Sequence, residues 1–382
     1  MSNKPETSQE LPRIRKRLAW LDGPLLSLCL GSVAIVIVAG LIQVRYGSYN
    51  MVFFEAWRAV TDPAVILNPD AWRAILFGPG VPILGAEFPD VSDETLIVWT
   101  IRMPRVFTAV LVGTALAISG AIFQAVTRNE LASPFVLGVS SGAGFTVLLT
   151  LVVFSGLTPF VPLLAAVGGT LAFLIVYVIA WQGGTSPVRL VLAGVIVNMV
   201  FQALQRALFF FADDIGVVQS AIAWITGSLT GVGWEQFRLA LPPTLITAVL
   251  AIAGARQLNV LLLGEETASA LGMRVELVRF LLSGVAILAA SGAIAVAGIV
   301  GFFGLVVPHV VRIVVGSDYR RLIVGCLFAG PALMVSADVG ARLGMQVVFG
   351  TPGQLPVGIV TGLIGGPYFL YLMRRQDRLG DI

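Results

Sequence analysis

Ten apolar runs, each of about span length, follow one another along this chain and leave most of its charge in the segments between them. We place these spans near residues 24–44, 106–126, 135–154, 160–181, 190–211, 238–255, 278–298, 299–315, 322–343 and 356–373. A bilayer core of about 30 Å takes roughly 20 apolar residues in a helix, and lipid admits only segments that satisfy their own backbone groups. The sequence therefore predicts an all-α, polytopic membrane protein with about ten transmembrane helices. Composition agrees, because 57% of the residues are hydrophobic and 12% are charged, whereas a soluble domain has about 25% charged residues.

The distribution of basic residues predicts how the spans are oriented. Ten spans put both termini on one side, and a cytoplasmic placement of that side gives it most of the 24 lysines and arginines, as the positive-inside rule requires. We therefore expect a cytoplasmic tail at 1–23 and one transmembrane domain at 24–382, in the inner or plasma membrane. The basic residues that remain outside or at outer helix ends are Arg45, Arg58, Arg73, Arg102, Arg105, Arg206, Arg238 and Arg342.

Three connecting segments are predicted to be ordered. One lies between the fifth and sixth spans, where VVQSAIAWITGSLTGVGW indicates a short outer helix or a re-entrant piece. In the long outer segment 46–101, Asn68-Pro69-Asp70 is a good helix start because an N-cap residue precedes a proline at the first helical position. Its three tryptophans, Trp57, Trp72 and Trp99, suit the membrane interface. In the inner loop 256–277, Glu265 and Glu266 are expected to begin a short helix that ends at Gly272, since acidic residues favour a first turn and glycine a C-cap.

The chain also contains a weak internal sequence repeat. The sequence Ser119-Gly120-Ala121-Ile122 of the second span recurs as Ser291-Gly292-Ala293-Ile294 in the seventh. In this topology the two spans run in opposite directions, which fits an inverted repeat of the kind found in transporters. Small residues are equally common where membrane helices pack closely, so both interpretations stay open.

The residue types exclude several functions. The only lysines are Lys4 and Lys16 in the N-terminal tail, so an ordinary phosphate-binding loop, which needs a lysine after its glycines, is ruled out. One histidine, His309, and two cysteines within apolar runs are too few for a usual zinc or haem site. We predict no catalytic residue, no metal and no cofactor in this chain, and no nucleic-acid partner, because its basic residues follow the topology.

Asp338 is the one acidic residue well inside an apolar run. Arg342 lies four positions on, so the two share a helix face and are expected to pair. One interpretation is a structural ion pair at the outer end of a helix. The other is a secondary transporter that couples ion movement through Asp338 and His309, because intramembrane ionisable residues mark such relays.

Several long motifs occur in a fixed order from Arg102 to Arg375. They are RMPR, GTALAISGAIFQAVTRNELASPFVLGVSSGAG, RLVLAG, WITGSL, LNVLLLGEETASALGM, GIVGFFGLVVPHVVRIVVGSDYRR, SADVGAR and LPVGIVTGLIGGPYF. In these motifs the chain resembles the FecCD-type permease subunits of type II ATP-binding-cassette importers, which take up iron siderophores, haem and cobalamin. It departs from them at Glu130, Tyr319 and Gln354, where the family usually has proline, histidine and glutamate. Residues 1–100 match only in general plan.

The resemblance implies a type II importer permease fold and a transport subunit that is not itself an enzyme. It implies two cytoplasmic ATPase subunits that bind ATP and Mg²⁺, an extracytoplasmic substrate-binding protein, and a second permease subunit that is a copy of this chain or a paralogue, all at the lipid membrane. The expected cargo is an iron(III) siderophore, with haem and cobalamin as alternatives.

The resemblance also implies roles for particular residues. The arginines that would receive glutamates of the binding protein are Arg102, Arg105 and Arg342. The residues that would contact the ATPase are Gly264, Glu265, Glu266, Ala268, Leu271 and Gly272. The residues that would help to close the pathway on the cytoplasmic side are Asn129 and Leu131.

Overall fold

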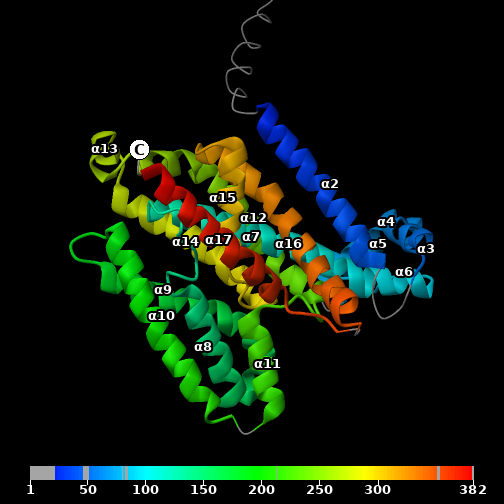
Figure 1. The fold of residues 1–382 in the computed structure, drawn as a ribbon. Coiled ribbons are helices and arrows are strands. Elements are labelled where there is room, and N and C mark those ends of the chain that lie inside the picture. The colour runs from blue at the N-terminus through cyan, green and yellow to red at the C-terminus, as the bar shows by residue number, and fades with distance from the viewer. Residues whose placement is uncertain are drawn as a thin grey trace, which may run out of the picture.

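The computed structural model describes residues 22–45, 51–79, 81, 85–212, 214–350 and 353–380, without the side chains of 346–349 and 372–380. In these residues the regular secondary structure is helical throughout (Figure 1). The predicted tail at 1–23 lies almost entirely outside the described residues. The elements are α2 (Gly23–Arg45), α3 (Phe53–Val60), α4 (Pro63–Ile66), α5 (Pro69–Phe77), α6 (Asp93–Ile97), the π-turn η2 (Val98–Arg102), α7 (Met103–Val126), α8 (Val139–Val152), the 3₁₀ turn η3 (Ser155–Phe160), α9 (Val161–Ala180), α10 (Pro187–Phe209), α11 (Ile215–Thr226), α12 (Trp234–Leu262), α13 (Glu265–Ala270), α14 (Val275–Ala297), α15 (Phe303–Val315), α16 (Tyr319–Phe349) and α17 (Val357–Gly380).

Each of the ten predicted spans coincides with a helix, which confirms the all-α prediction. Within the described residues, seven helical stretches are long and apolar enough to cross a membrane: Gly23–Arg45, Asp93–Val126, Ser155–Ala180, Pro187–Phe209, Trp234–Leu262, Val275–Ala297 and Tyr319–Met345. The helices α8, α15 and α17 are shorter apolar helices. A multi-pass membrane protein is therefore supported, while the count of about ten spans stays a prediction.

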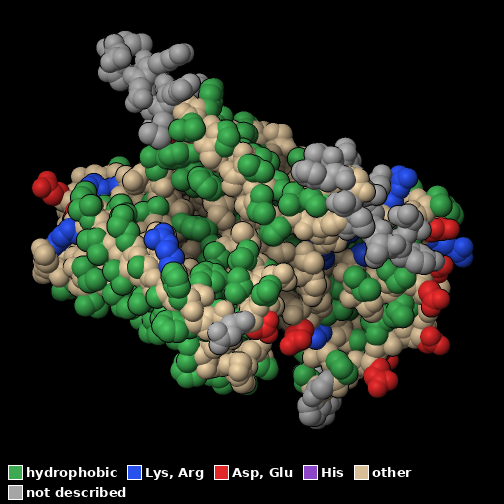
Figure 2. All heavy atoms as spheres, turned by 60° about the horizontal axis from the view of Figure 1, so that its bottom comes forward, with side chains coloured by type: hydrophobic (Ala, Val, Ile, Leu, Met, Phe, Trp, Pro, Cys, Tyr) green, Lys and Arg blue, Asp and Glu red, His purple; other side chains and the backbone are tan. Residues whose placement is uncertain are grey.

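The surface of the helical bundle is largely apolar. Figure 2 shows hydrophobic side chains over most of the visible face, and acidic side chains gathered at its right-hand end, where the outer segment lies. On α2, for example, Leu30 is 71% and Val38 is 57% exposed. Such exposure on a long apolar helix is expected of a surface that faces lipid.

The helix α7 lies at the centre of the bundle, packed against α12, α14, α15 and α16. Glycines let its backbone touch two of these neighbours. A Cβ at Gly120 would lie 1.7 Å from the carbonyl oxygen of Gly304, and one at Gly113 would lie 2.5 Å from that of Gly330. The second copy of the repeated sequence, in α14, also has a close contact at its glycine. A Cβ at Gly292 would lie 2.9 Å from Cγ of Pro243. Close packing thus explains the small residues, and the inverted repeat stays a prediction.

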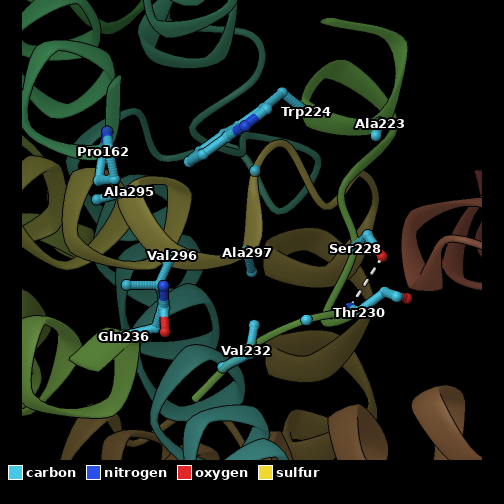
Figure 3. A pocket seen from close by; sticks show the side chains of 12 residues that line it. Pro162, Ala223, Trp224, Ser228, Thr230, Val232, Gln236, Ala295, Val296 and Ala297 are labelled. Atoms are coloured by element: carbon cyan, nitrogen blue, oxygen red, sulfur yellow. Dashed lines mark hydrogen bonds between the residues drawn. The ribbon is translucent and has the colours of Figure 1, made fainter. Parts of the chain in front are cut away.

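The apolar stretch from 277 to 315 is broken at the boundary between the predicted spans 278–298 and 299–315. The helix α14 ends at Ala297 and α15 begins at Phe303, after a residue with a left-handed φ of 61°, Phe302. The end of α11 and the segment after it hold this junction, because Ile299 N–H donates to Trp224 O at 2.9 Å and Ser228 N–H donates to Ala297 O at 2.8 Å. Irregular backbone at membrane depth is tolerated when protein buries it. A cavity of about 180 Å³ lies beside this junction, with Trp224, Ser228 and Ala297 in its wall (Figure 3).

The outer segment forms a small core of its own. Asn68 caps α5, as predicted, by accepting a hydrogen bond from Asp70 N–H at 2.9 Å. Trp57 and Trp72 are 44% and 37% exposed, in keeping with an interfacial position. The same expectation for Trp99 is wrong, because Trp99 is 3% exposed and its indole N–H donates to Ala59 O at 3.0 Å.

The glycine contact at the centre of the bundle gives a test. We expect Gly120→Ala to lower the free energy of unfolding by about 1–3 kcal/mol, because the added methyl group overlaps the α15 backbone. Thermal unfolding of the purified protein in detergent measures this difference. Gly284→Ala is the matched control, since Gly284 is also helical but has nothing within 4 Å of the added Cβ. Equal midpoints for the two variants would contradict the packing described.

Candidate functional site

Three polar clusters stand out against the apolar bundle, and each contains an arginine. The first lies at the end of α7 next to the outer segment. Arg102 is the last residue of η2, and Arg105 follows Pro104 in the first turn of α7. Arg102 donates to the carbonyl oxygens of Val44 and Arg45 at the end of α2. Both arginines are 4% exposed, so these guanidinium groups lie inside the protein.

Arg105 forms a bidentate ion pair with Asp338 of α16. Its Nη2 lies 2.6 Å from Oδ1 and its Nε lies 2.7 Å from Oδ2. The amide of Gln43 also donates to Asp338 Oδ2. Asp338 is therefore held by α7 and α2, and the expected pairing with Arg342 on its own helix is wrong. Arg342 Nη1 instead donates to Gln43 O at 3.2 Å.

A cavity of about 260 Å³ opens beside this ion pair. The residues that line it are Thr100, Ile101, Arg105, Thr230, Gly231, Val232, Gly233, Arg342 and Gln354. Gln354 accepts hydrogen bonds from Arg105 Nη1 at 2.6 Å and from Thr230 Oγ1 at 3.2 Å. The side chain of Gln354 is neutral.

The second cluster surrounds the turn after α7. Asn129 Oδ1 accepts a hydrogen bond from Leu131 N–H at 2.9 Å, and Asn129 O accepts one from Ala132 N–H at 3.1 Å. The preceding residue, Arg128, has a left-handed φ of 48°. Asparagine is suited to such a turn because its side chain bonds to backbone two residues on. The turn is thus a fixed structure, with Asn129 exposed and Leu131 half-buried.

Glu130 and Tyr319 meet in this cluster. Glu130 Oε2 lies 3.3 Å from Arg312 Nη1 and 3.8 Å from His309 Nδ1. Arg312 Nη2 also donates to Gln124 Oε1 at 2.8 Å and to the hydroxyl of Tyr319 at 3.3 Å. Glu130 and Tyr319 therefore act on the same guanidinium group. Sequence reasoning missed this, because residues 130, 312 and 319 are adjacent only in the fold.

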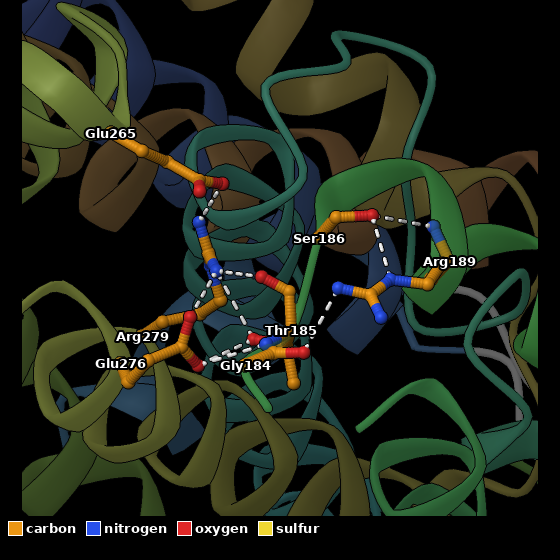
Figure 4. A network of polar contacts seen from close by, with 7 residues as sticks. All are labelled: Gly184, Thr185, Ser186, Arg189, Glu265, Glu276 and Arg279. Atoms are coloured by element: carbon orange, nitrogen blue, oxygen red, sulfur yellow. Dashed lines mark hydrogen bonds and ion pairs between the residues drawn. The ribbon is translucent and has the colours of Figure 1, made fainter. Parts of the chain in front are cut away.

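The third cluster ties α13 to the rest of the bundle (Figure 4). Arg279 of α14 is 1% exposed. Its Nη2 lies 2.7 Å from Glu265 Oε1 on α13, and its Nη1 lies 3.1 Å from Glu276 Oε1. Nη1 also donates to the carbonyl oxygen and the hydroxyl of Thr185, in the loop between α9 and α10. One buried guanidinium group thus joins α13, α14 and the segment that leads into α10.

The same loop is fixed from its other side. Glu276 Oε2 accepts hydrogen bonds from the backbone N–H of Thr185 at 3.1 Å and from its hydroxyl at 2.8 Å. Arg189, in the first turn of α10, donates to Gly184 O at 3.0 Å and to Ser186 Oγ at 3.3 Å. Figure 4 shows Thr185 between these two arginines, with Arg279 on one side and Arg189 on the other.

The structure separates the predicted ATPase-contact residues into two groups. Glu266, Leu271 and Gly272 are exposed, and Leu271 has 64% of its surface free. Gly264 is half-buried and takes a left-handed φ of 100° at the start of α13. Ala268 is 0% exposed, so it packs the helix against the bundle and has no surface to offer a partner. Glu265 is 42% exposed at its side chain but is committed to Arg279.

Comparison with known proteins matches this arrangement to one family. A sequence profile of the FecCD transport family matches residues 35–375. The Fe(3+)-citrate import system permease protein YfmD of Bacillus subtilis is 38% identical over 76% of this chain and 85% of its own length. The cobalamin import system permease protein BtuC of Halobacterium salinarum is 39% identical over 80% of each chain. The hemin transport system permease protein HmuU of Yersinia pestis is 39% identical over 75% of this chain and 85% of its own length.

A solved structure shows the same fold. It is an inward-facing conformation of a metal-chelate type ABC transporter, which superposes with a TM-score of 0.74 at 24% sequence identity and covers 91% of this chain and 99% of its own. Together with the profile match over most of the sequence, this fold places the motifs in their expected order on the helices. The chain belongs to the FecCD transport family of ABC importer permeases.

Proposed function

We propose that this chain is the membrane permease subunit of an ATP-driven importer for an iron(III) siderophore or a similar metal chelate. The observation that carries the proposal is the family match over residues 35–375, which includes both polar ends of α7 and the α13 loop. Relatives that import ferric citrate, cobalamin and hemin support a metal-chelate cargo. The ferric chelate is our first choice, with haem and cobalamin as alternatives.

ATP hydrolysis in the proposed importer would be carried out by another chain. The only lysines, Lys4 and Lys16, lie outside any glycine-rich loop, so this chain lacks the lysine that a phosphate-binding loop requires. We infer two cytoplasmic ATPases that bind ATP and Mg²⁺, an extracytoplasmic binding protein, and a second permease subunit that is a copy of this chain or a paralogue. The assembly would lie in the plasma or inner membrane, with both termini and α13 in the cytoplasm.

The helix α13 is the proposed contact with the ATPase. Its exposed residues Glu266, Leu271 and Gly272 offer the surface, whereas Glu265 faces Arg279. A displacement of α13 would act on Arg279 through this ion pair and then on Thr185, two residues before α10 begins at Pro187. Buried charge-assisted hydrogen bonds are strong and directional. The cluster would therefore make α13, α14 and the start of α10 move together.

The outer arginine cluster is the proposed receptor for the binding protein. Arg102 and Arg105 are buried and already bonded to Val44 and Asp338, so in this conformation they hold the helices around the cavity in place. Arg342 is half-buried and shares the wall of the 260 Å³ cavity with Arg105. A glutamate of the binding protein that enters this cavity would meet two guanidinium groups, which suit carboxylates.

The turn at Asn129 and Leu131 is the proposed cytoplasmic gate. Glu130 adds an ion pair from this turn to Arg312 of α15 and lies 3.8 Å from His309 of the same helix. Because the Glu130 side chain is 47% exposed, this contact is screened by water and can be broken at modest cost. The turn can therefore be held against α15 in one conformation and released in another.

A secondary transporter that uses Asp338 and His309 is disfavoured by the geometry. Asp338 contacts α2 and α7 near the outer segment. His309 faces Glu130 in the turn at the opposite end of α7. Both oxygens of Asp338 already accept hydrogen bonds from Arg105, which favours the structural role for this carboxylate.

Reconstitution decides between these two modes of energy coupling. We expect proteoliposomes that contain this chain with its ATPase and binding protein to accumulate ⁵⁵Fe-labelled chelate only with ATP and the binding protein. A protonophore should leave the uptake unchanged. An ATPase with its phosphate-binding lysine replaced is the control. Uptake that proceeds without ATP and collapses with the protonophore would establish the carrier instead.

Leu271 tests the coupling surface. We expect Leu271→Glu to lose at least about tenfold of the binding-protein-stimulated ATP hydrolysis and of the uptake, because a charge replaces a buried apolar contact at the subunit interface. Leu271→Met, which conserves volume, should retain both activities. Normal stimulation of ATP hydrolysis in Leu271→Glu would show that α13 does not couple this chain to the ATPase.

Arg342 tests the docking surface. We expect Arg342→Glu to weaken binding of the loaded binding protein at low salt by at least about tenfold, because a repulsive charge replaces an attractive one. Arg73→Glu is the matched control, since Arg73 also lies in the outer part of the protein but its side chain is 57% exposed and pairs with Asp70. If both charge reversals weakened binding equally, docking would depend on the overall charge and not on the cavity. If Arg342→Glu had no effect, the proposed receptor would be contradicted.

A further inference from the structure

The helix α10 carries a polar stripe on an otherwise apolar span. Asn198, Gln202, Gln205 and Arg206 stand at spacings of four, seven and eight residues, so they share one side of the helix. Polar and charged residues within membrane spans face the protein interior or a water-filled cavity, and they mark the paths of substrates and ions. The stripe lies in the half of α10 that leads to α11.

A cavity of about 300 Å³ lies against this stripe. Its wall comes from α8 and the segment before it, from α10 and α11, and from the segment between α14 and α15. The helices α8, α10 and α11 lie in the same part of the molecule in Figure 1. The residues that line it are Phe135, Ser140, Ser141, Asn198, Gln202, Gln205, Arg206, Phe209, Ile225 and Ile299. The outer arginine cluster contributes no residue to this wall.

Two polar groups of the cavity wall are bonded within the protein, and a third is not. Gln205 is 9% exposed and its amide donates to Ser141 O at 2.8 Å, which fixes the stripe against α8. Ser141 Oγ donates to Gly138 O at 3.0 Å. Ser140 is 3% exposed, and its Oγ has no hydrogen-bond partner among the residues described. A buried hydroxyl in a native protein is normally paired, so Ser140 points to a partner that enters the cavity.

The charge of the cavity is positive. Arg206 is the one charged residue in the described lining, and no aspartate or glutamate lines the cavity with it. Arg206 also makes no ion pair within the part of the chain that the structure describes. Arg206 lies in the last turn of α10 and is exposed, so its charge is available to a ligand in the cavity. The site is therefore complementary to an anion that carries several oxygen atoms.

We propose that this cavity is a subsite on the cargo path and that it binds a carboxylate arm of an anionic metal chelate. Arg206 would pair with the carboxylate, while Ser140, Asn198 and Gln202 would donate to its oxygen atoms or to neighbouring ones. The volume fits one arm rather than a whole siderophore. This inference rests on the proposed function and narrows it to carboxylate-bearing chelates, in preference to neutral or cationic ones.

Direct binding to the permease tests the subsite without the selectivity of the binding protein. The full chain in phosphatidylcholine nanodiscs is titrated with ⁵⁵Fe-labelled ferric citrate and with ferrioxamine B, which is cationic. We expect ferric citrate to bind at least about tenfold more tightly than ferrioxamine B, and Arg206→Gln to lose that preference. Arg206→Lys should keep most of the preference because it keeps the charge, and Ser140→Ala should weaken citrate binding by a smaller factor.

The control is Arg238→Gln, at another outer arginine, whose Nη1 donates to Ala74 O and Ile75 O away from the cavity; it should bind ferric citrate like the unmodified chain. Equal binding of the two chelates, no effect of Arg206→Gln, or no detectable binding of ferric citrate to the unmodified chain would each overturn the proposal. Displacement of ferric citrate by phosphatidylglycerol in the nanodisc would assign the site to a lipid phosphate and also overturn it. Failure of ATP-driven uptake with citrate binding intact would instead overturn the proposed function and leave the subsite standing.

Discussion

The bidentate pair between Arg105 and Asp338 is the interaction on which the outer half of the bundle depends. It joins the central helix α7 to α16 where both side chains are at most 5% exposed, and Gln43 adds α2 to the same carboxylate. Removal of one partner from a buried pair costs about 3–5 kcal/mol, because a charge is left without compensation. The pair therefore fixes the relative position of three helices, and Arg105 is not free to leave Asp338 for a partner protein. A carboxylate from outside has to approach the pair through the cavity that Arg342 also lines.

The inner end of the bundle uses the same chemistry for a different purpose. Arg279 is as buried as Arg105, but its carboxylate partners Glu265 and Glu276 are 42% and 38% exposed at their side chains. Arg312 likewise pairs with Glu130, which is 47% exposed. A guanidinium fork holds several acceptors in fixed directions, and water near the carboxylates lowers the energy needed to separate them. The outer pair is thus suited to hold a structure constant, and the inner pairs are suited to transmit or release movement.

The sequence predicts the helices well because apolar length and glycine breaks are local properties. The ten apolar runs, the break between α14 and α15, the cap at Asn68 and the short helix at Glu265 all depend on residues a few positions apart. The ion-pair partner of Asp338 is not determined by residues close to it in the sequence. The spacing of Asp338 and Arg342 makes a pair within one helix feasible, but Arg105 arrives from another helix with better geometry. The sequence also did not predict that Trp99 and Ala268 are buried. Trp99 is covered by the core of the outer segment, and Ala268 is covered by the bundle against which α13 packs. The meeting of Glu130 and Tyr319 on Arg312 could have been inferred only from a contact map.

The helix α10 links the inner clusters to the proposed cargo path. It has 23 residues, so at 1.5 Å per residue it is about 35 Å long. Its first residue, Pro187, directly follows the loop that Arg279, Glu276 and Arg189 hold, and its last turns carry Gln205 and Arg206 beside the cavity. A continuous helix transmits a displacement of one end to the other with little loss, because its hydrogen-bonded backbone is stiff over this length. Movement of α13 that reaches Thr185 would therefore also move Arg206 relative to Ser140, since Ser140 belongs to α8. In such an arrangement the conformational step that moves α13 would also change the fit of the cavity for its anion. Binding and release of cargo would then depend on the conformation of the inner clusters.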